Sequence, residues 1–165
     1  MCTTLAGMHH RRGSSADLEP RPWAGVPFAA PLGAVDRVEA LRGDDGRPLE
    51  VTAQKAIDPD NPYIAAHFPG FTIYPGAFVA ETVLQAVALA HAPSERPLPT
   101  IATIRHLRLL APLLADDTLS CSARVTPREP PELHQVVAEV RRGDGRAAAR
   151  LDCEIRFRAD APPPR

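Results

Sequence analysis

The sequence lacks the features of a nucleic-acid binder or of a disulfide-stabilised secreted protein. Its 19 Lys and Arg residues against 20 Asp and Glu residues give a formal net charge of −1, whereas a general nucleic-acid binder is normally visibly basic. The cysteines, Cys2, Cys121 and Cys153, lie far apart and form no CxxC pair, which argues against a disulfide framework or a zinc site. We therefore expect free thiols in a reducing compartment, no metal and no nucleic-acid partner.

Apolar runs long enough to span a bilayer are also missing. Glu81 and Gln85 interrupt the longest apolar run, so no segment reaches the roughly 18 to 20 residues that a membrane-spanning helix needs. The N-terminal stretch "MCTTLAGMHHRRGSS" lacks the basic, then apolar, then small-residue order of a secretory signal. These absences predict a cytoplasmic protein without membrane contact.

The composition is that of an ordinary globular domain. The 165 residues, 44% hydrophobic and 24% charged, suffice for one domain with a substantial core. Prolines gather towards both ends, at Pro20, Pro22, Pro27 and Pro31 and again at 162–164. We expect a flexible extension over residues 1–26, one domain over 27–158 and a flexible tail over 159–165.

Alternating apolar and polar residues predict several strands. The expected strands cover residues 49–57, 99–113, 117–127, 133–142 and 147–159, with 32–41 as a strand or a short helix. The "GDG" at 143–145 is a hairpin signal between the last two strands. A helix is expected from Gly76 to about His91, and it is apolar on nearly all sides, which is typical of a buried helix. The pattern predicts an α+β fold in which a curved antiparallel sheet wraps around one long central helix.

The polar exceptions in that helix are Glu81, Thr82 and Gln85. Burying an ionised carboxylate without a partner costs several kcal/mol, so a carboxylate in this setting calls for an explanation. Glu81 and Gln85 are four residues apart and lie on one helix face, where their side chains can hydrogen-bond. We expect this pair to hold the carboxylate in one orientation.

Two Pro-Gly pairs, Pro69-Gly70 and Pro75-Gly76, bracket the stretch "FTIY". Proline favours the first central position of a turn and glycine supplies the positive φ of the next, which predicts a rigid loop. Gly76 also stands at the expected helix start, where backbone N–H groups lack helical partners and the helix dipole is positive. The missing side chain would let a ligand carbonyl approach, as in an oxyanion-type site.

His67, Glu81 and the Gly76 amide together suit the dehydration of a 3-hydroxyacyl thioester. That reaction needs a base for the proton next to the carbonyl, an acid for the departing hydroxyl and stabilisation of enolate-like charge. Histidine serves as a base near neutral pH, and an apolar setting favours the protonated form of a carboxylic acid. A lone histidine before a turn is more often a structural residue, and the apolar setting makes Glu81 the stronger candidate. Spacing alone leaves a structural and a catalytic interpretation open for both residues.

The motif "HFPG", then "YPG", then "ETVLQ" resembles the signature of the hotdog-fold 3-hydroxyacyl-acyl-carrier-protein dehydratases of the FabZ type. Members of that family typically carry HFPG, a short apolar stretch, PG, several apolar residues and then E-A-x-x-Q. "PFAAPLGAVDRVEAL" and "IRHLRLLAPLLADDTL" resemble further family segments, so the resemblance runs from about Pro27 to Phe157. It implies a single hotdog domain.

The resemblance assigns roles to four residues. It implies that His67 is the catalytic histidine and that Glu81, fourteen residues later, is the catalytic acid. It further implies that the Gly76 amide polarises the thioester carbonyl and that Gln85 orients the glutamate. The glutamate favours this branch over the related dehydratase-isomerases, which carry aspartate there. The resemblance also implies that no cofactor is needed and that the substrate is carried on the phosphopantetheine arm of an acyl carrier protein.

The resemblance also implies partners. The family shares its active site between subunits, the histidine and the acid coming from different chains, so we expect at least a dimer, either of this chain or with a related hotdog subunit. Acyl carrier proteins are acidic, which makes a basic rim expected. The candidates for that rim are Arg37, Arg105 and Arg108, although arginines alternating on a strand also mark an ordinary solvated face. The candidates for an acyl tunnel, which would serve equally as core or dimer-interface residues, are Phe68, Phe71, Ile73, Phe78 and Val79.

The sequence departs from the family pattern at two places, and two other functions remain as alternatives. Ala66 replaces the usual glycine before the histidine, and "ADD" at 115–117 replaces the usual Pro-Gly-Asp turn. The alternatives are a hotdog acyl thioesterase, or a non-catalytic or heterodimeric subunit that binds acyl carrier protein. Whether the chain serves fatty-acid or polyketide biosynthesis is also left open by its sequence.

Overall fold

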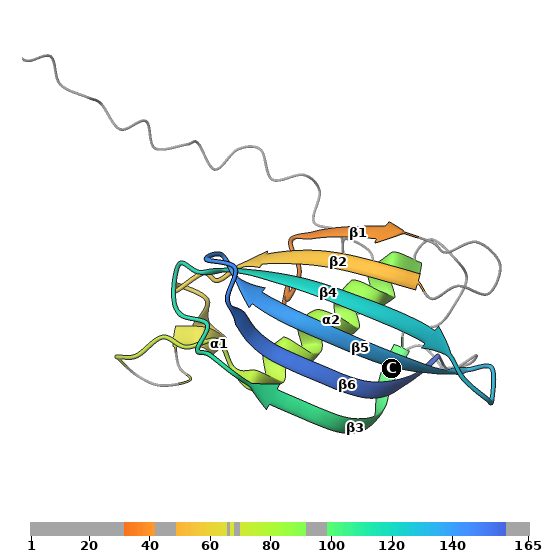
Figure 1. Cartoon of the computed structure of the whole chain (residues 1–165). Coiled ribbons are helices and arrows are strands. Elements are labelled where there is room, and N and C mark those ends of the chain that lie inside the picture. The colour runs from red at the N-terminus through yellow and green to blue at the C-terminus, as the bar shows by residue number, and fades with distance from the viewer. Residues whose placement is uncertain (1–31, 42–48, 66, 68–69, 92–98, 158–165) are drawn as a thin grey trace, which may run out of the picture.

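The computed structural model describes residues 32–41, 49–65, 67, 70–91 and 99–157. The predicted flexible segments over 1–26 and 159–165, and the candidate tunnel residue Phe68, lie outside the described residues. Figure 1 shows the arrangement of the described elements.

The described strands form a six-stranded antiparallel sheet in the order β1-β2-β4-β5-β6-β3. Most strands lie beside their neighbours in sequence, but β3 has crossed to the far edge, next to β6. β1 and β3 are therefore the two edge strands. The strand bounds are Arg37–Leu41 (β1), Leu49–Ala56 (β2), Pro99–Leu109 (β3), Thr118–Pro127 (β4), Leu133–Arg142 (β5) and Ala147–Phe157 (β6).

A single long helix, α2 (Gly76–His91), lies along one face of this curved sheet (Figure 1). Its bounds coincide with those that the apolar run predicts. It packs against β1, β2, β3 and β4. The expected α+β fold, a curved antiparallel sheet around one central helix, is confirmed. Within the described ranges, no helix is both long and apolar enough to cross a membrane.

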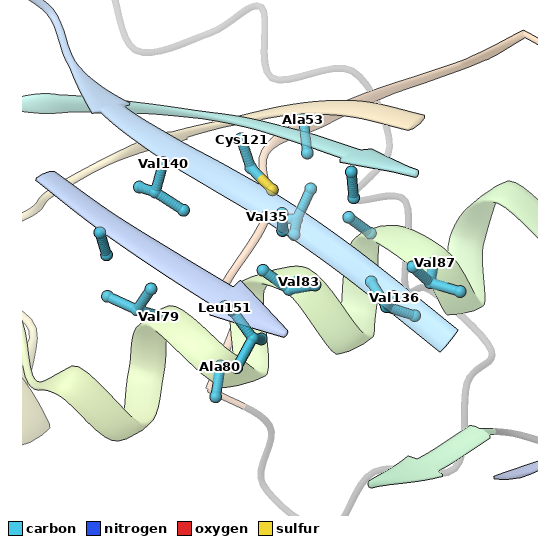
Figure 2. Close-up of a cluster of buried hydrophobic side chains, with 14 of the residues drawn as sticks. Val35, Ala53, Val79, Ala80, Val83, Val87, Cys121, Val136, Val140 and Leu151 are labelled. Atoms are coloured by element: carbon cyan, nitrogen blue, oxygen red, sulfur yellow. The ribbon is translucent and has the colours of Figure 1, made fainter. Parts of the chain in front are cut away.

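The core lies between α2 and the inner face of the sheet, and strand alternation creates it. In β4, in β5 and in β6 from Ala149 onwards, every second side chain is buried, because successive side chains point to opposite faces of a strand. Figure 2 shows Val79, Val83 and Val87 of α2 beside these strand side chains. Cys121 and Cys153 belong to the same cluster, as free thiols. Burial raises the pKa of the Cys121 thiol from 9.0 to about 12 and that of Cys153 to about 11.

The cover of α2 is less complete than its apolar sequence predicts. Ala77 is exposed, and Glu81, Leu84 and Ala88 are only partly buried. These four residues are spaced by three or four positions, so they form one stripe along the helix. The sheet of one chain covers the opposite side of α2, and Glu81 lies on the stripe that it leaves partly open.

A short helix that the sequence patterns did not predict, α1 (Pro62–Ala65), precedes the Pro-Gly loop. Asn61 starts it: its side-chain oxygen accepts a hydrogen bond from the Tyr63 amide at 3.0 Å, and its carbonyl accepts bonds from Ile64 and Ala65. Asparagine is a strongly preferred residue at this position. A four-residue helix is too short to show a hydrophobic period, which is why the pattern misses it.

Candidate active site

His67 lies in the turn that follows α1, and its side chain is exposed. Its backbone amide donates to the carbonyl of Ile64 at 3.2 Å, which continues the turn of α1. The ring of Tyr63 in α1 makes an edge-to-face contact with Phe78 in α2, at 6.5 Å between centroids. Helix α1, which leads into the turn with His67, therefore packs against the first turn of α2.

The Pro75-Gly76 turn is fixed from both sides. Before it, the Tyr74 amide donates to the carbonyl of Leu113 at 2.8 Å, and Ile73 forms a bridge with Leu114. After it, the Pro75 carbonyl accepts bonds from the amides of Phe78 and Val79. Since Gly76 is the first residue of α2, its amide belongs to the N–H groups that have no partner within the helix.

The reason for a glycine at position 76 differs from the one that the turn pattern predicts. Among the described glycines, only Gly70 and Gly145 have a positive φ, of 82° and 83°. The expectation of a positive φ thus holds for Gly70 but is wrong for Gly76, which is a helical residue. A Cβ on Gly76 would lie 2.9 Å from Cδ1 of Leu109. The missing side chain lets α2 approach the end of β3.

Glu81 and Gln85 form the predicted pair on one face of α2. The Gln85 Nε2 group donates to Oε1 of Glu81 at 2.8 Å. Gln85 is buried, with 5% of its surface exposed, whereas Glu81 is partly buried. A carboxylate that is held from the buried side keeps its outer surface available to a substrate.

The side chain of Gln85 is itself held by the chain that leads into β1. Its Nε2 group also donates to the Leu32 carbonyl at 2.8 Å, and its Oε1 atom accepts from the Ala34 amide at 3.0 Å. Both Nε2 hydrogens and the carbonyl oxygen are therefore engaged, which fixes the orientation of the amide. This contact bridges more than fifty residues, and the sequence pattern carries no signal for it.

A buried hydroxyl pair lies beside Glu81. Tyr74 and Thr82 are 4% and 0% exposed, and their hydroxyl oxygens are 3.0 Å apart. Sequence analysis marks Thr82 as a polar exception in the helix but gives it no partner, because a contact between a loop tyrosine and a helix threonine needs the fold. Burial raises the pKa of Tyr74 from 10.0 to about 12; the bond to Thr82 opposes this rise, and the charges of Asp36 and Glu81 add to it.

The candidate tunnel residues differ in their surroundings. Phe71 is 56% exposed, Ile73 and Phe78 are partly buried, and Val79 is 1% exposed within the core cluster. The ring of Phe78 lies between two tyrosines, since Tyr74 also contacts it edge to face at 5.6 Å. Val79 thus fills the core that Figure 2 shows, and Phe78 packs against the edge of that core.

The three candidate arginines do not lie together in one chain. Arg37 is on the edge strand β1, whereas Arg105 and Arg108 are on β3 at the opposite edge. Arg105 is paired with Glu154. Arg108 borders a groove of about 690 Å³ that also involves Arg124, Val137 and Arg150, on the sheet face that points away from α2. A basic rim that contains all three arginines is therefore absent from a single chain.

No metal-binding arrangement accompanies these residues. In the part of the chain that the structure describes, no group of three or more His, Cys, Asp or Glu side chains could hold a metal ion. The candidate residues supply an imidazole and a carboxyl group from side chains, and the backbone supplies an amide at a helix start. These groups can bind and polarise a carbonyl and move protons next to it.

Solved structures of known proteins share this fold. The PaaI protein of E. coli, from the phenylacetic acid degradation operon, superposes with a TM-score of 0.52 at 16% identity, over 73% of this chain and 79% of that protein. A hypothetical thioesterase with coenzyme A from Streptococcus pneumoniae gives a TM-score of 0.55 at 12% identity, over 78% of this chain and 91% of that one. At these identities the likeness concerns the fold alone. The chain is a hotdog-fold protein.

Comparison with known sequences identifies the family of hotdog-fold proteins to which the chain belongs. The model of the FabA-like domain matches residues 27–141. The 3-hydroxyacyl-[acyl-carrier-protein] dehydratase FabZ of Polynucleobacter asymbioticus is 30% identical over 135 residues, which cover 79% of this chain and 87% of the relative. The enzyme of the same name from Polynucleobacter necessarius is 28% identical over 134 residues, with the same coverage of both chains. The chain belongs to the FabA-like family, and its resemblance to the FabZ-type dehydratases is confirmed.

Proposed function

We propose that this protein removes water from a 3-hydroxyacyl thioester carried on acyl carrier protein and forms the trans-2-enoyl thioester. The observation that carries the proposal is the Glu81 carboxylate, held by Gln85 on α2 less than two turns from the Gly76 amide at the helix start. FabZ relatives that carry this activity in their names support the same reaction. The reaction requires no cofactor on this scheme.

Each candidate group has one role in the proposed mechanism. The Gly76 amide donates a hydrogen bond to the thioester oxygen, where negative charge develops. His67 takes the proton from C2, and the electron pair of that C–H bond forms the C2–C3 double bond while the C3–O bond breaks. Glu81, in its protonated form, gives its proton to the departing hydroxyl, which leaves as water. Proton return from His67 to Glu81 through the released water would restore the starting forms. Positioned proton transfers of this kind contribute about 10² to 10⁴ each in rate.

We further propose that two chains complete the site, by pairing through the edge strand β3. Among the described strands, β3 has β6 as its only neighbour, so its other edge is open. Ile104, Leu109 and Leu110 on and next to this strand are 47%, 60% and 46% exposed. A long, apolar and unpaired edge favours pairing with another strand. A copy of this chain is the simplest partner, and an acyl carrier protein would deliver the substrate.

The test follows the loss of one water from 3-hydroxyacyl groups on an acyl carrier protein, measured by mass spectrometry for several acyl chain lengths. We expect turnover by the wild type and a fall of at least about 10²-fold in the variants His67→Ala and Glu81→Gln. Release of a free acid would point to a thioesterase instead. A folded protein that binds the carrier without turnover would point to a non-catalytic subunit.

Sharing of the site between chains has its own test. When His67→Ala and Glu81→Gln chains are expressed together, a mixed dimer with two shared sites contains one intact site and one doubly altered site. Random pairing would then restore about a quarter of the wild-type activity. No recovery from co-purified mixed dimers would mean that each chain supplies its own histidine and acid.

A further inference from the structure

The strongest unassigned feature is the hydroxyl pair of Tyr74 and Thr82. The direction of the hydrogen bond between the two hydroxyls follows from their other contacts. The Thr82 hydroxyl donates its single hydrogen to the Phe78 carbonyl at 2.8 Å. The Thr82 oxygen, 3.0 Å from the tyrosine oxygen, must therefore be the acceptor and Tyr74 the donor. A directed chain runs from the loop tyrosine through the helix threonine to the helix backbone.

The two hydrogen-bonded residues lie next to the two proposed catalytic groups. Tyr74 directly precedes the Pro75-Gly76 turn, and Thr82 directly follows Glu81. The bond therefore ties the two segments that carry the proposed carbonyl-polarising amide and the proposed acid. The Tyr74 ring also contacts Phe78 edge to face, so the ring and the hydroxyl of one side chain hold the same turn of α2.

Core packing alone gives no reason for two hydroxyls here. Both side chains lie in the apolar core region and are almost fully buried. A buried hydroxyl is unfavourable unless it is paired, whereas an apolar contact would tolerate small shifts. A paired donor and acceptor specify one spacing between loop and helix.

We infer that Tyr74 and Thr82 are positioning residues, whose hydrogen bond sets the placement of the Gly76 amide relative to the Glu81 carboxyl. This inference rests on the proposed dehydratase function. The pair acts through those two groups and does not itself transfer protons. Because the pKa of Tyr74 is about 12, the phenol stays protonated and keeps its donor role over the whole range in which a histidine base works.

The test uses four variants and two readouts. Tyr74→Phe removes the donor, Thr82→Val removes the acceptor, the double variant removes both, and Thr82→Ser keeps the hydroxyl. For each, kcat and KM on 3-hydroxyacyl-carrier substrate are measured beside the midpoint of thermal unfolding. Tyr63→Phe is the matched control, because it removes a hydroxyl from the other tyrosine that contacts Phe78.

We expect kcat to fall about tenfold in Tyr74→Phe and in Thr82→Val, with KM changed less than about twofold, since misplacement of reacting groups lowers the rate of the chemical step. Thr82→Ser and Tyr63→Phe should keep the wild-type kcat. Thr82→Val leaves the tyrosine donor buried and unpaired, so it should lower the unfolding midpoint most, and the double variant should regain part of that loss. The activity of the double variant should stay low, as expected for two residues that act as one unit.

The outcomes separate the inference from the function on which it rests. Wild-type turnover with unchanged kcat in folded Tyr74→Phe and Thr82→Val proteins overturns the positioning role alone. Recovery of kcat together with stability in the double variant also overturns it, because the pair would then matter only for folding. Absence of turnover by the wild type overturns the proposed function and the positioning role together.

Discussion

Gln85 donates a hydrogen bond to Glu81 across one turn of α2 and is held in turn by the backbone of Leu32 and Ala34. The segment that leads into β1 therefore reaches the proposed acid through a single side chain. Catalytic carboxylates depend on such supports, because a small error in their placement is costly in rate.

Replacing this glutamine should damage both stability and activity. We expect Gln85→Leu to lower the free energy of unfolding by about 1–3 kcal/mol, because the Ala34 amide and the Leu32 carbonyl lose their buried partner. We expect kcat to fall at least about tenfold, because the carboxylate loses its fixed orientation. Urea unfolding and the dehydration assay measure the two effects.

The sheet offers a matched control for this variant. Gln135 donates to Oδ1 of Asp152 at 3.0 Å, a glutamine–carboxylate pair that joins β5 and β6 away from the site. Gln135→Leu should keep kcat. An equal loss of kcat in both variants would contradict a specific role for Gln85.

The close approach of Leu109 to Gly76 predicts that a substitution at Gly76 is harmful and that a smaller residue at position 109 compensates for it. In Gly76→Ala the new methyl group would lie 2.9 Å from Leu109 Cδ1, so the leucine side chain must move. Since Cδ1 is the far end of a flexible side chain, we expect a cost below about 1 kcal/mol in unfolding but a clear loss of kcat through displacement of the turn. The double variant Gly76→Ala with Leu109→Ala should recover activity in the fraction that still elutes as a dimer, because Leu109 also belongs to the proposed pairing edge. Gly143→Ala, whose methyl group would make only ordinary contacts, is the control.

Asp116 predicts a stabilising substitution. Its φ of 64° lies in the left-handed region, which glycine adopts without steric cost and other residues adopt less readily. Asp116→Gly should therefore raise the free energy of unfolding by about 0.5–1 kcal/mol, and Asp116→Val should lower it. Thermal unfolding of the three proteins measures both changes, and a destabilised glycine variant would contradict the argument. The family pattern with glycine in this turn fits the same geometry.

The buried thiols and Tyr74 predict a loss of stability in alkaline solution. Their pKa values rise on folding, from 9.0 to about 12 for Cys121, from 9.0 to about 11 for Cys153 and from 10.0 to about 12 for Tyr74. In each case the unfolded chain loses its proton first, so the unfolded state gains stability as pH rises above about 9. The free energy of unfolding should fall from pH 9 upwards, and the variant Cys121→Ala with Cys153→Ala should show a shallower fall. A flat profile between pH 9 and 11 would contradict the burial argument.

The regular elements of this fold could be predicted because each one carries its own period. The apolar run of α2 and the alternation of β4, β5 and β6 give element type and bounds to within a few residues. The pairing of Glu81 with Gln85 follows from helix geometry and could be predicted for the same reason. Local sequence suffices wherever the partners are one turn apart.

The contacts that cross the chain could not be predicted in this way. Neither the anchoring of Gln85 by Leu32 and Ala34 nor the bond between Tyr74 and Thr82 has a periodic signal. The stripe of α2 that includes Leu84 and Ala88 reads as fully buried in the sequence but is only partly covered. The exposure of this stripe depends on how much of the helix the strands of one chain cover. The sequence of the helix carries no information about that cover.

The two cysteines of the core have a further consequence for how the molecule can be studied. Cys121 on β4 and Cys153 on β6 belong to the core cluster, and each is 1% exposed. A thiol reagent can reach these sulfur atoms only when helix and sheet separate. The rate at which each is labelled, read peptide by peptide, therefore reports how often that part of the structure opens under native conditions. The two thiols are therefore natural probes of local opening at the contact between α2 and the sheet.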